Sequence, residues 1–205
     1  MLRQLLLTTT NKKNLPHTML HLIACLGNIG DEYARTRHNI GFRIADRLAA
    51  DAGVTFEDRR YGFVCRFRVK NQELLVLKPS TYMNLSGNAV RYWLRKENIP
   101  EERLLVCADD VSLPFGRLRI KPGGSEAGHN GLRSITQQLA TQQYARLRFG
   151  IGGDYPRGGQ IDYVLGNFLP EQEEALPERI ALAADAVRAY TLSGIDFAMN
   201  RYNNK

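Results

Sequence analysis

Two histidine–asparagine pairs are the residues of this sequence best suited to chemistry. His38-Asn39 stands in TRHNIGF (36–42), and His129-Asn130 stands in AGHNGL (127–132). A histidine with an ordinary pKa of about 6.5 can take a proton from water and return one to a leaving group at neutral pH. His38 is therefore a candidate general base, with a satisfied packing histidine as the alternative.

Other polar side chains stand at the ends of predicted elements. Asn28 and Asp109 each follow an apolar run, and Asn84 precedes a predicted helix. Ligands of open α/β sheets bind in the crevice beyond the carboxyl ends of the strands, so we expect these side chains to converge there with His38 and Asn130. Taken singly, each asparagine at position 39, 84 or 130 can be a helix N-cap, and Asp109 can be a turn residue. Capping alone does not account well for their joint placement.

The elements that must position these side chains follow from the apolar pattern. Short apolar or alternating runs predict strands over 20–27, 61–69, 74–79, 103–108, 117–121 and 145–152. Helical spacing predicts helices over 40–53, 84–99, 132–140 and 170–194, the last either continuous or restarting at Pro177. Strands that alternate with helices, plus one hairpin, predict a single α/β domain. Its sheet is expected to be twisted, mixed and mostly parallel, with helices on both faces.

Several familiar chemistries lack their motifs. The glycines of LGNIGDEY have the wrong spacing for a dinucleotide-binding fingerprint, and the chain has neither a P-loop nor a G-x-S-x-G nucleophile motif. Zinc would need a compact cluster of His, Cys or carboxylate ligands, and none is indicated: His17 and His21 have H-x-x-x-H spacing, but His21 lies in a predicted strand rather than on a helix. A metal held by His38, His129 and distant acids is not refuted. We expect no metal and no cofactor.

Composition indicates the kind of partner and compartment. Lys and Arg number 28 against 21 Asp and Glu, a formal net charge of +7, which favours a polyanionic partner such as nucleic acid. Cys25, Cys65 and Cys107 form no C-x-x-C pair and are predicted to be buried free thiols in the reducing cytoplasm. No run approaches the roughly 20 apolar residues that cross a bilayer, so no membrane partner is expected.

The first 18 residues carry basic side chains and no acid. Their LLL run is too short for a signal-peptide core. We expect residues 1–18 to be a disordered extension, or the product of an early start codon with Met19 as the true start; a transit peptide is the alternative. Residues 19–205 are expected to form the domain.

Read in order, the longer motifs of the chain resemble those of one family, bacterial-type peptidyl-tRNA hydrolase. The motifs are LGNIGDEYARTRHNIGF (26–42), KPSTYMNLSGNAV (78–90), DDVSLPFGRLRIKPGGSEAGHNGL (109–132), YARLRFGIGG (144–153) and DYVLGNF (162–168). The resemblance implies an esterase in which water cleaves the bond between a peptide and the terminal ribose of tRNA. tRNA is then the partner, and we expect a monomer.

The resemblance also implies roles for individual residues. His38 matches the catalytic histidine and Asp109 its aspartate partner. The residues that match substrate-binding positions are Asn28, Tyr33, Met83, Asn84 and Asn130. Lys121 and Arg148 match a basic pair that resembles a clamp for the tRNA 5′-phosphate. No metal is implied.

The chain departs from the family pattern at a few positions. Ile29 replaces the proline of Gly-Asn-Pro-Gly, and Ala108 and Ser112 replace residues around the aspartate. In the glycine-rich lid, Ser125 and Glu126 stand where glycine and histidine are frequent. Two other classes of function stay open at this point: a non-catalytic RNA-binding relative of the same fold, and an esterase of small substrates. The second has no need of the Lys121–Arg148 clamp.

Overall fold

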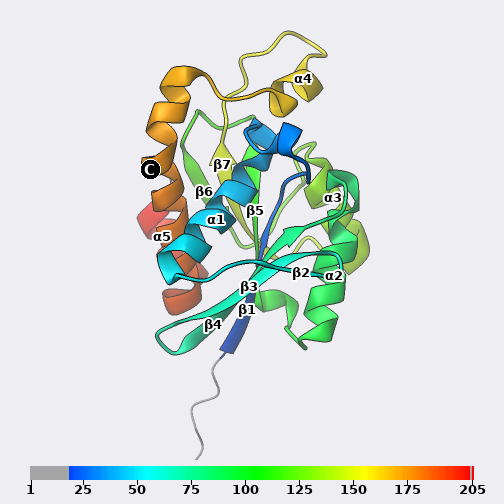
Figure 1. Cartoon of the computed structure of the whole chain (residues 1–205), viewed down its shortest axis with the longest axis vertical. Coiled ribbons are helices and arrows are strands. Elements are labelled where there is room, and N and C mark those ends of the chain that lie inside the picture. The colour runs from blue at the N-terminus through cyan, green and yellow to red at the C-terminus, as the bar shows by residue number, and fades with distance from the viewer. Residues whose placement is uncertain (1–18, 204) are drawn as a thin grey trace, which may run out of the picture.

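A single seven-stranded sheet organises the chain. The computed structural model describes residues 19–203 and 205, and the expectations for residues 1–18 lie outside them (Figure 1). The strands are β1 (Met19–Cys25), β2 (Glu57–Arg59), β3 (Gly62–Val69), β4 (Gln72–Pro79), β5 (Leu104–Asp110), β6 (Leu118–Lys121) and β7 (Ala145–Gly150). Their order in the sheet is β2-β3-β4-β1-β5-β7-β6. The four central strands are parallel, and β2, β3 and β6 extend the sheet antiparallel at its two sides.

Helices cover both faces of this sheet. They are α1 (Ile40–Ala52), α2 (Ser86–Lys96), α3 (Asn130–Leu139), α4 (Gln160–Leu165) and α5 (Pro170–Tyr202). One apolar layer lies between the sheet and α1 and α5, and the other lies between the sheet and α2 and α3. Leu22 and Ile23 of β1 belong to opposite layers, as successive side chains of a strand must. The predicted mixed, mostly parallel α/β fold is therefore confirmed.

Helix α1 illustrates how the sequence specifies an element. Ile40, Ile44 and Leu48 recur at helical spacing and are fully buried. The helix ends at Gly53, which takes the left-handed conformation (φ 65°) favoured for glycine after a helix. A Cβ at Gly41 would lie 2.3 Å from the carbonyl oxygen of Leu26, so only glycine lets α1 pack this closely on the end of β1.

Two elements were not predicted, and one was only partly described. β2 and α4 contain no buried residue, so no apolar pattern marks them. α5 runs through Pro177 and continues to Tyr202, interrupted only by non-helical angles at Gly194. No helix in the described part of the chain combines the length and the apolar character that crossing a membrane requires.

The predicted state of the cysteines is confirmed. Cys25, Cys65 and Cys107 are all buried and free. Burial raises the pKa of the Cys65 thiol to about 11 and that of Cys25 well above its usual range. Both thiols therefore stay protonated and unreactive at neutral pH.

Candidate active site

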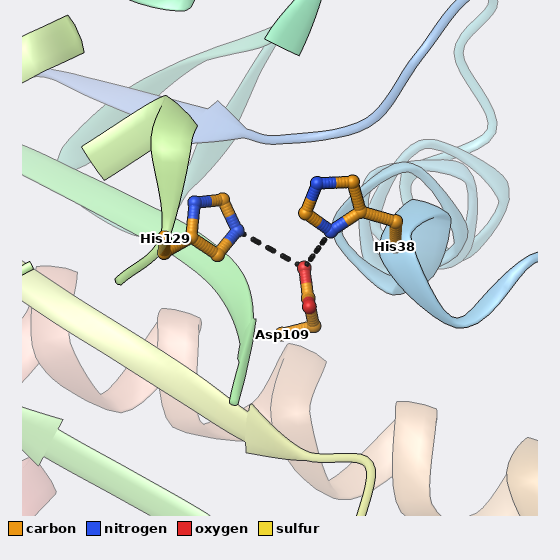
Figure 2. A group of neighbouring side chains, drawn as sticks. All are labelled: His38, Asp109 and His129. Carbon is orange, nitrogen blue, oxygen red and sulfur yellow. Dashed lines mark hydrogen bonds and ion pairs between the residues drawn. The ribbon is translucent and has the colours of Figure 1, made fainter. Parts of the chain in front are cut away.

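The site lies at the edge of the sheet where the parallel strands β1, β4, β5 and β7 end. His38 belongs to a short 3-10 turn (Arg37–Asn39) that leads into α1. Asp109 is near the end of β5, and His129 directly precedes α3. Figure 2 shows the two imidazole rings on either side of the Asp109 carboxylate, with one ring nitrogen of each directed at it.

A single carboxylate oxygen joins the three side chains. Asp109 Oδ1 lies 2.8 Å from His38 Nδ1 and 3.0 Å from His129 Nε2. Burial alone would raise the pKa of Asp109, but the charges and hydrogen bonds of the two histidines outweigh it and hold that pKa well below its usual range. Asp109 is therefore ionised at neutral pH and accepts a hydrogen bond from each ring.

The tautomer of His129 follows from its second contact. Its Nδ1 accepts hydrogen bonds from the backbone N–H groups of Gly131 (3.1 Å) and Leu132 (3.3 Å), which makes His129 the N-cap of α3. Because Nδ1 accepts, the ring hydrogen lies on Nε2 and is donated to Asp109. His129 is thus a buried, doubly fixed support for the carboxylate.

His38 has the complementary arrangement. Its Nδ1–H faces Asp109, so the lone pair of the neutral ring is on Nε2, which Figure 2 shows on the side away from the carboxylate. Burial lowers the pKa of His38, but the charge and the hydrogen bond of Asp109 outweigh burial, and the pKa is raised. A base oriented by a carboxylate, with its second nitrogen free, is the arrangement that activates a nucleophile in catalytic triads.

A cleft of about 180 Å³ opens beside these side chains. Its lining includes His38, Asp109, His129, Asn130, Arg148 and, from α4, Ile161. Of the predicted site residues, His38, Asp109, Asn130 and Arg148 therefore line one cleft. Asn28, Tyr33, Met83, Asn84 and Lys121 do not line it.

The three asparagines proposed as helix N-caps do not cap with their side chains. Asn39 bonds across the chain instead: its Oδ1 accepts from the Asn28 backbone N–H (2.9 Å), and its Nδ2 donates to the Asn28 carbonyl (2.8 Å). Asn84 lies exposed in the turn before α2, whose N-cap position is Leu85. Asn130 is the first residue of α3 and is exposed, since His129 supplies the cap. The Asn84 side chain is thus exposed at the site, and Asn130 Oδ1 accepts from Arg133 Nη1 (3.4 Å), which leaves its Nδ2 as a donor.

Asn28 links the two sides of the site. Its Oδ1 accepts from the Met83 backbone N–H (3.2 Å), which leaves its Nδ2 as a half-exposed donor. Met83 itself is buried, and its sulfur packs close to Gly131 of α3. The Asn28 side chain therefore fixes the turn that carries Asn84 through a hydrogen bond. The buried side chain of Met83 packs this turn against α3. Tyr33 is half-buried in the neighbouring 3-10 turn (Asp31–Tyr33).

The two predicted phosphate ligands differ in their surroundings. Lys121 is exposed on β6, and its register partner on β7 is Arg146 rather than Arg148. The Arg148 side chain is only 12% exposed, and its Nε lies 3.2 Å from Asp110 Oδ2. Asp110 also accepts from the backbone N–H (2.8 Å) and hydroxyl (2.6 Å) of Ser112. Arg148 is thus held at the cleft by a buried carboxylate that the sequence analysis did not assign.

The glycine-rich lid is tied to the sheet edge. Arg146 is 2% exposed and donates from Nη1 to the Ser125 carbonyl (2.7 Å) and from Nη2 to the Gln142 carbonyl (3.3 Å). Gln142 Nε2 in turn donates to Glu126 Oε1 (3.0 Å). The two residues by which the lid departs from the family pattern, Ser125 and Glu126, therefore lie at its anchoring points.

Among the described residues, His38, Asp109 and His129 also form a group of side chains that could hold a metal ion. One ligand atom from each lies within 4.8 Å of the others. Hydrogen bonds account for this geometry without a metal, because the α3 backbone keeps the His129 hydrogen on Nε2 and thereby blocks the nitrogen that would bind the ion. The sequence pattern marks His129-Asn130 before a helix but assigns no role to His129, whose contact with Asp109 follows only from the fold.

Comparison with known proteins identifies the family. The profile described as "Peptidyl-tRNA hydrolase" matches residues 22–205. The peptidyl-tRNA hydrolase of Parabacteroides distasonis is 60% identical over 187 residues, which cover 91% of this chain and all of the relative. That of Porphyromonas gingivalis is 57% identical over 185 residues, covering 90% of this chain and all of the relative.

A solved structure agrees with the sequence relatives. The crystal structure of peptidyl-tRNA hydrolase from Acinetobacter baumannii superposes with a TM-score of 0.85 at 33% identity, covering 91% of this chain and 96% of that one. These matches support the catalytic interpretation over a non-catalytic RNA-binding relative. The chain belongs to the peptidyl-tRNA hydrolase family.

Proposed function

We propose that His38 is the general base with which this enzyme hydrolyses the ester between a peptide and tRNA. The observation that carries the proposal is the 2.8 Å contact of His38 Nδ1 with Asp109, which turns Nε2 of the neutral ring away from the carboxylate. Water bound at Nε2 loses its proton to His38 as it attacks the ester carbonyl. The imidazolium formed is stabilised by Asp109 and returns the proton to the departing ribose oxygen. Such acid–base catalysis contributes about 10²–10⁴-fold.

The amide side chains are proposed to hold the substrate. Neutral amides can donate to a developing oxyanion without adding a charge. Each such donor is worth roughly 3–4 kcal/mol. The half-exposed Nδ2 of Asn28 and the exposed amides of Asn84 and Asn130 are the candidates. Tyr33 is proposed to contact the substrate from the neighbouring turn, and Met83 to keep Asn84 in place.

The basic residues are proposed to bind the tRNA end. Lys121 and Arg148 lie on one face of the antiparallel β6–β7 pair, at diagonal positions. Together they can bind a 5′-phosphate next to the cleft. We further propose that the enzyme works in the cytoplasm, for which the buried free thiols are the supporting feature, and that it works as a monomer.

The test is release of tRNA from an N-blocked aminoacyl-tRNA by the intact chain and by His38→Ala. The variant should lose nearly all hydrolysis, because the other histidine of the cleft, His129, has both ring nitrogens bonded to Asp109 and the α3 backbone. It should still bind tRNA. Arg68→Ala, at an exposed position of the β3–β4 hairpin, is the control for handling of the protein. Full activity of His38→Ala would end the proposal.

A further inference from the structure

A second groove lies along α2, separate from the cleft of His38. It has a volume of about 420 Å³ and shares no lining residue with that cleft. Its lining residues belong to helix α2 and to the β2–β3 turn. Figure 1 shows where α2 and β2 lie in the fold. Its lining is dominated by four cations and two tyrosines: Arg60, Tyr61, Arg91, Tyr92, Arg95 and Lys96. We call this the α2 groove.

Helical spacing produces one wall of the α2 groove. Arg91 and Arg95 are four residues apart on α2 and are exposed, while Trp93 and Leu94 are buried against the sheet. The opposite wall is anchored to this helix, because Trp93 Nε1 donates to the Arg60 carbonyl (3.1 Å). Both walls are therefore fixed by buried groups.

The charges of the α2 groove are not neutralised. No ion pair in the described part of the chain involves Arg60, Arg91, Arg95 or Lys96. Glu97, the acid next in sequence, is bonded to Arg66 instead. Four like charges around one concavity create a positive potential that attracts anions.

Aromatic rings lie among these charges. The Tyr61 and Tyr92 centroids are 5.3 Å apart at 69°. The Arg60 guanidinium lies over both, at 5.2 and 5.3 Å. Tyr61 is 37% exposed, so a planar group can reach its ring. Cations that follow a backbone, combined with rings on which bases stack, are the recurring features of sites for single-stranded nucleic acid.

We propose that the α2 groove binds a single-stranded segment of RNA, with Arg91, Arg95 and Lys96 on the phosphates and the Tyr61–Arg60 platform on a base. An acidic peptide or an anionic membrane would also use the cations, but a ring exposed for stacking beside phosphate-binding cations is the combination typical of single-stranded nucleic acid sites. The inference does not depend on the ester chemistry at His38. It concerns RNA other than the terminal ribose in the cleft.

The groove is close enough to the cleft for both to contact one RNA. The turn that carries Asn84 leads directly into α2. At about 1.5 Å rise per residue, Arg91 and Arg95 lie roughly 8 and 14 Å along the helix from its first residue, Ser86. RNA that extends past Asn84 can therefore reach the groove.

The test is binding of a fluorescein-labelled, ten-nucleotide single-stranded RNA without an ester, measured by anisotropy over a range of salt concentrations. The double variant R91E/R95E should bind at least about tenfold more weakly, with a salt slope lower by about 1.4, because each lost phosphate contact on a single strand contributes about 0.7. Tyr61→Leu should weaken binding about fivefold or more with the slope unchanged, since stacking carries no charge. Thermal unfolding checks that the variants fold.

The matched control is R68E/K70E, which makes the same charge change at two exposed positions of the β3–β4 hairpin. Equal weakening by both double variants would overturn the proposal in favour of general charge attraction, as would unchanged binding by R91E/R95E. Tighter binding of polyglutamate or of phosphatidylserine vesicles than of RNA, lost in R91E/R95E, would also overturn it. Failure of the proposed hydrolase would instead appear as absent ester cleavage by the unmodified chain, so the two failures are distinguishable.

Discussion

Replacing Asp109 with asparagine removes the charge that both histidines face while keeping the shape of the side chain. Asp109 Oδ1 lies 2.8 Å from His38 Nδ1, and its side chain is 3% exposed. At an effective dielectric constant of about 20, unit charges at that distance attract by roughly 6 kcal/mol. The dipole of the asparagine amide retains part of this attraction. Loss of the cost of burying the carboxylate charge offsets another part, so we expect a net loss of roughly 3 kcal/mol of stabilisation of the His38 imidazolium. That corresponds to a fall in kcat of about 10²-fold.

The same substitution should move the pH dependence in a defined direction. His38 works as a base only when neutral, so kcat/KM falls as the pH drops below its pKa. In the unmodified chain Asp109 raises this pKa against the opposing effect of burial. Without the carboxylate only burial is left, and the acidic limb of the profile should move to lower pH. Measurement of kcat/KM against pH for both proteins, on N-blocked aminoacyl-tRNA, shows the shift.

Asp110→Asn is the matched control, because it makes the same chemical change one residue along β5. Asp110 faces Arg148 and Ser112 rather than His38, so its substitution should leave the acidic limb in place. Asp109→Asn with unchanged kcat, or with a limb shifted to higher pH, would refute the role given to the carboxylate.

Three further outcomes are expected. Lys121→Ala should raise KM roughly tenfold or more for substrates with a 5′-phosphate, since a hydrogen bond to a charged group contributes about 1.5–3 kcal/mol. The KM for unphosphorylated substrates should not change. Equal KM changes for both substrates would reject the clamp. Asn39→Ala should lower the free energy of unfolding by about 2–4 kcal/mol in urea titrations, because both backbone groups of Asn28 lose their partner. Asn39→Asp, which keeps one of the two bonds, should fall between, and equal stability of all three proteins would contradict this account. A chelator should leave hydrolysis unchanged, and inhibition by it would revive a metal at His38, Asp109 and His129.

Local pattern was sufficient to predict most of the fold. The apolar spacing of Ile40, Ile44 and Leu48 predicts α1, and Gly53 ends it as expected. The three residues of β2 are exposed and none of the six residues of α4 is buried, so neither element carries such a pattern. These two elements are specified by tertiary contacts, such as the hydrogen bond from Arg37 to the Tyr163 carbonyl (3.2 Å).

Part of the geometry of the candidate site could be predicted from the sequence. His38 and Asp109 were paired from the resemblance and lie in contact. The place of His129 was not predicted, because it depends on two contacts made at once, with the α3 backbone and with Asp109. The position of Asn39 before a helix predicts an N-cap, yet its side-chain amide bonds to the backbone of Asn28, eleven residues away. Such pairings are created by folding and have no signature in sequence.

The most direct test of the central claim compares two titrations of the unmodified enzyme. One follows the His38 ring by NMR, assigned from the spectrum of His38→Ala, and the other follows kcat/KM for hydrolysis. We expect the His38 ring to titrate above the ordinary histidine pKa of about 6.5. The midpoint of the acidic limb of the kcat/KM profile should equal the pKa measured for the ring. A ring that titrates below that value, or a rate profile indifferent to it, would contradict the assignment of His38 as the base.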